Sequence, residues 1–486
     1  MNASNVHSTA TARYQGGDRL IFGIVLAVVT FWLFAQTTLN IAPAMRRDLQ
    51  IAEGVSNIAV SITALFSGIF IVVAGGLADR LGRVRLTNVG LALSILGSLL
   101  IALSPAGTAV FLMAGRIIQG ISAACIMPAT LALMKAYFDG KDRQRALSFW
   151  SIGSWGGSGL SSLFGGFVAS TIGWRWIFWM SIGVAVLSFF LIRGTPESKV
   201  ESTARPRFDW LGLIAFVFAM VALNVVIGQG AALGWLSPAV MVLSAVFVVS
   251  TIAFFKIETG NANGFVDLAL FGNKTFSGAT LSNFLLNGAA GTLLVVLTLV
   301  QEAAGLSSLQ SGLLTVGYLV GVLATIRVGE KLLQRMGPRK PMLLGCWTTG
   351  AGVLLTALTF LLAGEYLIVA SVGFTLFGVG LGLYATPSTD AALSNVPQEN
   401  AGSASGIYKM ASSLGAALGV AISAATFAGF SRVEGVVPFA EIAMGRTDNI
   451  HVRFAASVAL MFNVLMVVIA IIAIVLTVPK QNRQSE

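Results

Sequence analysis

One short stretch gathers charge between two long apolar segments. Gly75–Arg85 holds one acid, three arginines and three glycines within eleven residues. Glycine permits tight turns and a charge is costly inside a membrane, so we expect a short aqueous loop between two helices. The loop residues that can form turns or ion pairs are Gly75, Asp79, Arg80, Gly82 and Arg83.

Arg116 lies about two turns into an apolar segment, and Gln119 follows three residues later on the same helical face. A guanidinium at that depth is costly unless it has a partner or faces water. Two roles remain open. Arg116 and Gln119 line a transport cavity, or Arg116 is a structural arginine that binds carbonyl groups of neighbouring helices.

Four further polar side chains lie within apolar segments: Gln36, Asn283, Asn287 and Lys409. Gln36 cannot titrate, but it can hydrogen-bond a substrate or a neighbouring helix. Asn283 and Asn287 share one helical face, which should look inward, toward either a substrate or another helix. Lys409 either extends its ammonium group to the membrane interface or lines the cavity.

Acids are absent from the middle of every apolar segment, because the 20 acidic residues fall in tails, loops or segment ends. A proton-coupled carrier needs a titratable group, and a carboxyl group beside a cavity can supply one. The candidate proton sites are Glu330, Asp390, Asp79 and Glu302. Without a central acid, Arg116 and Lys409 favour a zwitterionic or anionic substrate over a permanent dication.

The composition is typical of a polytopic membrane protein. Of the 486 residues, 56% are hydrophobic and only 10% are charged, whereas a soluble domain carries about 25% charge. The net charge of +10 resides mostly in loops, so it indicates membrane topology and not nucleic-acid binding. Nucleotide-binding, zinc-binding and nucleophile motifs are absent from the sequence. We therefore expect a protein that is not an enzyme or an ATP-driven pump and that has no metal and no cofactor.

Fourteen apolar segments are long enough to cross a bilayer, which takes about 20 residues each. Lys and Arg concentrate in the loops on the side of Gly75–Arg85, so both termini should be cytoplasmic. The predicted fold is all-α. We place the spans at residues 20–42, 55–77, 86–104, 108–134, 146–170, 176–192, 210–228, 238–255, 276–300, 309–326, 342–362, 367–387, 404–428 and 454–478.

The chain also repeats weakly, because Arg80–Arg83 is echoed by Arg335–Lys340 between two later apolar segments. Such an echo predicts two six-helix halves related by an axis along the membrane normal, with helices 7 and 8 inserted between them. The predicted divisions are a tail (1–19), an N-terminal half (20–192), a linker (193–209), an inserted helix pair (210–255), a C-terminal half (276–478) and a second tail (479–486).

Several motifs resemble those of one transporter family. The pattern G-x-L-A-D-R-x-G-R-x-R in Gly75–Arg85 resembles the loop between helices 2 and 3 of the major facilitator superfamily, and Leu112–Gly120 resembles its helix-4 motif. The fourteen-helix layout resembles the drug:proton antiporter-2 branch of that family. This resemblance implies that the loop is a conformational switch, and that Asp142 pairs with one of its arginines to latch the cytoplasmic side.

Two positions depart from the pattern of that branch. Gln36 stands two residues before Thr38, where the branch has an Asp. The branch's antiporter signature G-x-x-x-G-P-x-x-G-G is matched in the fifth segment, although Ser161-Ser162 replaces Gly-Pro. Glycines at this spacing still predict close helix contact without a proline kink. The matching positions are Gly157, Gly165 and Gly166.

Over the whole chain, runs such as Ala123–Thr130, Gly140–Ser148 and Tyr384–Asp390 resemble quinolone and multidrug efflux pumps of this branch, which also carry Gln at the position of Gln36. The resemblance implies a proton-driven antiporter that exports quinolones and other lipophilic drugs by alternating access and confers antibiotic resistance. Its partners would be lipophilic or zwitterionic drugs, protons and membrane lipid, with no nucleic acid. We expect a monomer in the bacterial cytoplasmic (inner) membrane.

Two other functions remain open on the sequence. One is a dedicated exporter of a single endogenous metabolite that uses the same fold. The other is a non-transporting membrane sensor or scaffold, for which the inserted helix pair would suit a partner protein.

Overall fold

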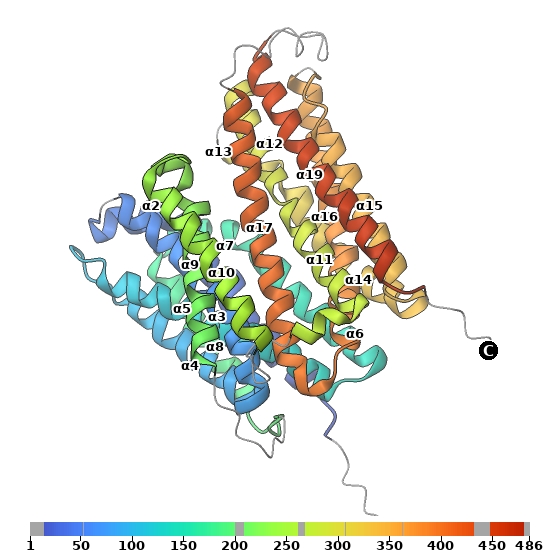
Figure 1. Cartoon of the computed structure of the whole chain (residues 1–486). Coiled ribbons are helices and arrows are strands. Elements are labelled where there is room, and N and C mark those ends of the chain that lie inside the picture. Colours follow the sequence, from blue (N-terminus) through green and yellow to red (C-terminus); the bar gives the residue numbers. More distant parts are fainter. Residues whose placement is uncertain are drawn as a thin grey trace, which may run out of the picture.

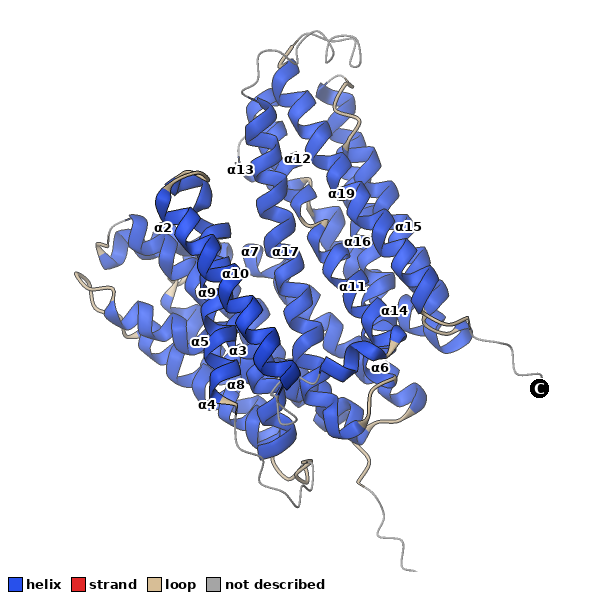
Figure 2. Cartoon of the chain, in the orientation of Figure 1, coloured by secondary structure: helices blue, strands red, loops and turns tan. Residues whose placement is uncertain are grey.

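The computed structural model describes residues 14–51, 53–199, 209–260, 268–306, 308–361, 363–431 and 448–480. Parts of the predicted tails and linker, residues 1–13, 200–208 and 481–486, lie outside the described residues. Within the described ranges the regular structure is helical and contains no strand (Figure 2). The predicted all-α fold is confirmed.

The helices before the linker pack against one another as a first group (Figure 1). Two of its continuous helical segments, which we call rods, change helix type along their length. The first rod comprises α1 (Asp18–Val29), the π-helical turn η1 (Thr30–Phe34), the 3₁₀ turn η2 (Ala35–Thr37) and α2 (Thr38–Leu49). The other comprises α6 (Gly140–Ser151), the π-helical turn η3 (Ile152–Gly156) and α7 (Gly157–Thr171). The regular helices are α3 (Glu53–Leu81), α4 (Arg83–Ala102), α5 (Val110–Tyr137) and α8 (Arg175–Ile192).

The helices after residue 268 form a second group. Its α17 (Ala401–Ser431) presents Gly415 and Gly419 four residues apart, and a Cβ at either would meet the carbonyl oxygen of Phe284 or Gly288. Small residues at this spacing let helix backbones approach closely. The other elements are η4 (Leu268–Gly272), α11 (Lys274–Gly288), α12 (Gly291–Ala304), α13 (Ser308–Leu313), α14 (Val316–Met336), α15 (Arg339–Thr356), α16 (Ala363–Ser394), η5 (Gln398–Asn400) and α19 (Ile450–Thr477).

Two helices lie between these groups in sequence, α9 (Trp210–Leu233) and α10 (Pro238–Gly260). They pack against each other, and α9 also contacts α3 and α17. Asp209 caps α9 by accepting a hydrogen bond from the Gly212 amide at 2.9 Å. Only 11% of the most apolar part of α10 is buried inside the protein, which suits a helix that faces lipid.

Every predicted span coincides with a helix or with a helix pair. The span predicted at 276–300 is broken between Gly288 and Gly291, where α11 meets the glycines of α17. The span predicted to end at Pro387 continues as α16 to Ser394. Among the described residues, 11 helices are long and apolar enough to cross a membrane, and a shorter apolar helix covers Trp210–Leu223. The predicted polytopic membrane fold is therefore confirmed.

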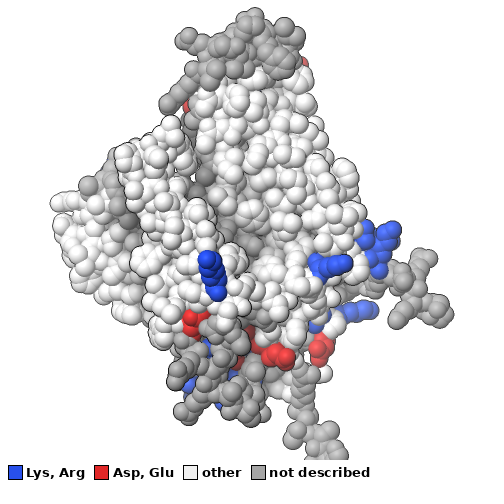
Figure 3. Space-filling model, in the orientation of Figure 1, with Lys and Arg blue, Asp and Glu red and all other residues white. Residues whose placement is uncertain are grey.

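The two groups touch at one end of the molecule and diverge toward the other (Figure 1). The contacts between them join α3 and α5 to α17, and α6 to α14 and α16. Farther from this end, η3 also contacts α14. On the face in Figure 3, the lysines, arginines and acids gather around this lower end. We call it the charged end. The described ends of the chain also lie there, because Gly16 bonds to Tyr137 and Arg339 bonds to Val478.

Candidate functional site

Asp79 links the two groups at the charged end. Its carboxylate accepts hydrogen bonds from the amides of Gly402 at 2.8 Å and Ser403 at 2.9 Å, the first residues of α17. The amides at a helix N-terminus lack intrahelical acceptors, and the helix dipole favours an anion there. Asp79 is therefore an anionic cap supplied by α3 to a helix of the other group.

Gly75 sets the distance at which these helices meet, because a Cβ at Gly75 would collide with the carbonyl oxygen of Gly402. This glycine lies within α3, which continues to Leu81. The predicted loop is thus reduced to Gly82, whose φ of 114° belongs to the left-handed region that favours glycine. Asp79 lies on a helix and not in the predicted loop.

Arg83 completes this cluster. Its guanidinium donates to Asp79 Oδ1 at 2.8 Å and also to the carbonyl oxygen of Gln398, which precedes α17. Glu197 caps α4 by accepting from the amides of Val84 and Arg85, both at 2.9 Å. Arg80 is exposed and makes no hydrogen bond or ion pair among the described residues.

A second set of contacts at the charged end joins α5 and α6 to α16. The Lys135 ammonium donates to the carbonyl oxygens of Leu393 and Val396 at the end of α16. Arg143 donates to Asp390 at 3.3 Å. Asp142 is exposed and has no ion pair among the described residues, so the latch through Asp142 stays a prediction.

Irregular turns shape the contact between the rod α1–η1–η2–α2 and the rod α6–η3–α7. The π-helical turns η1 and η3 lie against each other, and such turns are often found at functional sites. A Cβ at Gly157 would lie 3.2 Å from Leu33 N, and one at Gly165 would lie 2.9 Å from Thr37 Cβ. These two glycines therefore face the first rod, whereas a Cβ at Gly166 would meet nothing within 4 Å.

Gln36 lies in η2 beside this contact. It is half-buried, and no described residue hydrogen-bonds its side chain. Its amide therefore remains available to a ligand or to water. Substrate contact by Gln36 stays a prediction.

Arg116 is buried and fully engaged by protein oxygens. Its guanidinium donates to the carbonyl oxygens of Ala59 at 2.9 Å, Ala35 at 2.8 Å and Val60 at 3.3 Å. It also donates to Gln119 Oε1 at 2.9 Å. These bonds tie α5 to α3 and η2, as expected for a structural arginine. A contact between Arg116 or Gln119 and a substrate stays a prediction.

The predicted asparagine pair also has protein partners. Asn283 is buried and donates to the Tyr408 carbonyl oxygen of α17 at 3.0 Å. Asn287 is half-buried and donates to Asn283 Oδ1 at 2.9 Å. The side chain of Asn283 thus serves an interhelical contact in this state, and substrate contact by Asn287 stays a prediction.

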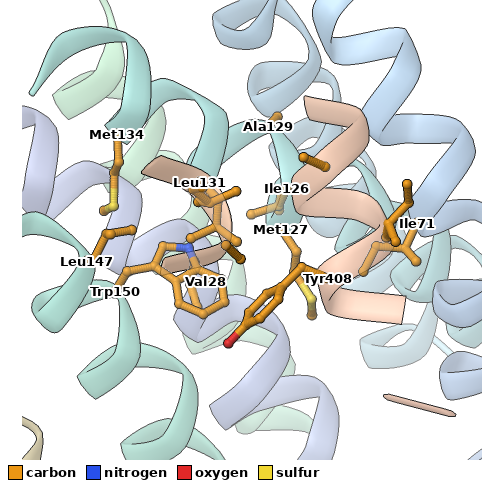
Figure 4. Packing of buried hydrophobic residues seen from close by; sticks show 14 of the residues in the cluster. Val28, Ile71, Ile126, Met127, Ala129, Leu131, Met134, Leu147, Trp150 and Tyr408 are labelled. Carbon is orange, nitrogen blue, oxygen red and sulfur yellow. The ribbon is translucent and has the colours of Figure 1, made fainter. Parts of the chain in front are cut away.

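Lys409 lies two turns into α17 and is only 7% exposed. Its Nζ sits 4.2 Å from the centroid of the Trp150 ring of α6, so this contact also joins the two groups. The cluster around it is apolar, with Val28, Met127 and Tyr408 close to Trp150 (Figure 4). A desolvated cation–π contact contributes about 2 kcal/mol, whereas burying an ion costs several kcal/mol. The ring alone does not offset the burial of this ammonium group.

The four predicted proton sites differ in their surroundings. Glu330 is buried and ion-paired with Arg327, and Asp390 is buried beside Arg143. Asp79 is buried in the cluster described above, whereas Glu302 is exposed at the end of α12. Each of the three buried acids therefore has a cationic partner in this state, and none lies alone in the middle of a span.

The fold and these contacts agree with the comparisons with known proteins. A family model described as Major Facilitator Superfamily matches residues 20–420 and again residues 279–486. The chain belongs to the major facilitator superfamily. It is a transporter and not an enzyme, as the sequence predicted.

Two relatives within the superfamily resemble the chain over nearly its whole length. Quinolone resistance protein NorB of Staphylococcus aureus (strain COL) is 51% identical over 469 residues, which is 96% of this chain and 97% of that protein. The NorB protein of strain MRSA252 is 50% identical over the same share of both chains.

Solved structures of the superfamily share the fold at low identity. The proton:xylose symporter XylE superposes with a TM-score of 0.64 at 15% identity, covering 95% of this chain and 96% of XylE. The human organic anion transporter MFSD10 (TETRAN) gives a TM-score of 0.59 at 14% identity, covering 94% of this chain and 98% of MFSD10. Similarity at this level shows the fold alone.

Proposed function

We propose that this protein is a proton-driven efflux transporter that exports quinolones and other lipophilic drugs by alternating access and thereby confers antibiotic resistance. The observation that carries the proposal is the 51% identity to a quinolone resistance protein across 96% of the chain. The transporter would act as a monomer in the bacterial cytoplasmic membrane. The concentration of lysine and arginine at the charged end favours cytoplasmic termini.

Alternating access is supported by the position of the contacts between the two groups. In the described state the groups are joined at the charged end by Asp79, Arg83, Lys135 and Arg143, and they diverge at the opposite end. With the charged end in the cytoplasm, this is an outward-facing state. Drug loading requires these contacts to break, with residues 20–192 and 276–478 moving as two halves.

Proton coupling is expected at a buried acid whose charge helps to hold one state. Asp390 fits this role well, because its partner Arg143 belongs to the other group of helices. Protonation of Asp390 removes the attraction and weakens closure of the charged end. Glu330 pairs with Arg327 within α14, so its protonation changes a contact inside one group.

The test is drug accumulation in everted membrane vesicles, with norfloxacin, ethidium and a dicationic biocide, with and without a proton gradient. We expect gradient-dependent uptake of norfloxacin. Glu330→Gln and Asp390→Asn then locate the proton site, because the variant that lacks it loses the dependence on the gradient. No uptake of any of the three drugs, with the protein present in the membrane, would favour a dedicated metabolite carrier.

The sensor or scaffold alternative is tested with Asp79→Asn. This change removes the anion at the start of α17 and leaves the apolar surface unchanged. Loss of drug export at normal expression contradicts a scaffold, because a scaffold needs no moving charged end. Full export by the variant would contradict the role of Asp79 as the anionic cap that joins α3 to α17.

A further inference from the structure

Lys409 differs from every other buried cation in the described part of the chain. Arg83, Arg116, Lys135 and Arg453 each donate to carbonyl or carboxylate oxygens. The ammonium group of Lys409 contacts the face of Trp150 and no oxygen acceptor among the described residues. An ammonium group has three donors and no acceptor, so its hydrogen-bonding capacity is unused in this state.

Along α17, Lys409 lies between a buried residue and an exposed one. Ser405, one turn toward the charged end, is fully buried. Ser413, one turn in the other direction on the same helical face, is exposed, and Ser412 beside it is half-buried. Lys409 is itself buried against Trp150 in this state, so a molecule can reach its ammonium group only when this contact between the two groups opens.

The surroundings of Lys409 suit a flat, partly apolar molecule. Trp150, Tyr408 and Met127 are buried in this state. When the two groups separate, the first two supply aromatic surface and Met127 supplies an adaptable apolar contact. The indole N–H of Trp150 is engaged with Thr130 Oγ1 at 3.0 Å, so it does not compete for a ligand. The acids at the charged end, Asp79 and Asp390, are engaged with their own partners.

We infer that Lys409 is the residue that binds the carboxylate of transported drugs, with the drug's ring system lying against Trp150 and Tyr408. This inference rests on the proposed function and names its substrate class, namely aromatic anions and zwitterions that carry a carboxylate. The ammonium group exchanges its ring contact for a charge-assisted hydrogen bond. A permanent cation is repelled at the same position.

The experiment measures dissociation constants for the purified full chain in detergent. The probes are norfloxacin and decarboxylated norfloxacin, which share the ring system and differ in the carboxylate. Wild type should bind norfloxacin at least tenfold more tightly, and Lys409→Met should abolish this preference by weakening norfloxacin alone. Lys409→Arg should retain the preference, and Lys256→Met, which removes an exposed lysine of α10, should match wild type.

Two results overturn the inference. One is an equal loss of affinity for both probes in Lys409→Met, which indicates a structural role for the lysine. The other is a wild type that binds the two probes equally, or binds neither. The proposed function fails separately, when wild-type vesicles accumulate neither norfloxacin nor ethidium. If vesicles transport both drugs and Lys409→Met slows both alike, the proposed function stands and the inference fails.

Discussion

Arg116 and Lys409 are buried cations in different groups of helices, and they are surrounded by different chemistry. The Arg116 guanidinium donates to three backbone carbonyl oxygens and to Gln119. The Lys409 ammonium faces the Trp150 ring. Oxygen atoms of the protein thus accept hydrogen bonds from Arg116, whereas the ammonium group of Lys409 keeps its hydrogen-bonding capacity unused.

This difference separates two uses of a buried charge. A cation saturated by backbone oxygens holds helices together, and its removal takes one hydrogen bond from each of those oxygens. A cation without an oxygen acceptor contributes little to stability and remains free to bind an anion. The charged end resembles the region around Arg116, because Asp79, Arg83 and Lys135 there all bond to backbone groups across the two groups.

The largest predicted effect is the loss of stability in Arg116→Met. A hydrogen bond to a charged group contributes about 1.5–3 kcal/mol, so the variant, which loses the hydrogen bonds of the guanidinium, should lose roughly 3 kcal/mol or more. Lys409→Met removes a poorly compensated charge and keeps apolar contact with Trp150, so its stability should stay within about 1 kcal/mol of wild type. Thermal unfolding of both variants in detergent measures the difference. Equal destabilisation of the two would remove the distinction between the sites.

An intermediate effect is predicted for Gly75→Ala. The added Cβ meets the Gly402 carbonyl oxygen, and such overpacking costs about 1–3 kcal/mol. Because the strain exists only when the charged end is closed, the population should shift toward a state that is open there. Gly68→Ala is the matched control in α3, where a Cβ meets nothing within 4 Å. Spin labels at the exposed positions Arg80 and Glu399 report the separation across the charged end.

Longer distances between these labels are expected in Gly75→Ala and unchanged ones in Gly68→Ala. Identical distance distributions in the two variants would mean that α3 and α17 tolerate the methyl group. The helices at the charged end would then be less tightly packed than those around Arg116.

The smallest effect is predicted for Arg143→Gln. Its guanidinium is partly exposed, with a relative side-chain exposure of 18%, and it meets Asp390 at 3.3 Å. Exposed and half-exposed ion pairs contribute about 0–1 kcal/mol, so the transport rate should change by less than roughly fivefold. The dependence of that rate on the proton gradient should weaken, because Asp390 no longer has Arg143 as its partner. Vesicle uptake at low and high salt measures the change. A loss as large as that of Asp79→Asn would give this pair a role equal to that of the Asp79 cluster.

The repeated pattern of the sequence corresponds to one structural feature that the two turns share. Gly82 and Gly337 each connect two antiparallel helices and adopt positive φ, 114° and 72°. The sequence could find them because a left-handed turn strongly favours glycine and therefore leaves a residue-specific signal. The exposure of Asp142 could not be predicted, because charge alone does not say toward which side of a helix an acid points.

The positions of the helices were determined by the sequence itself. A backbone in lipid must satisfy its own hydrogen bonds, so each long apolar run has to become a helix. The break at Gly288–Gly291 could not be found in this way, since it depends on the close approach of Gly415 and Gly419 from α17.

Tertiary structure alone decided which buried charges are satisfied. Asp79 bonds to the amide of Gly402, 323 residues later, and Lys135 bonds to the carbonyl oxygen of Leu393, 258 residues later. These partners are backbone groups, which nearly every residue carries, so no residue type in the sequence marks them. For the same reason the sequence could not distinguish Arg116 from Lys409. Only the packed helices show that backbone oxygens surround the arginine and that an aromatic ring faces the lysine.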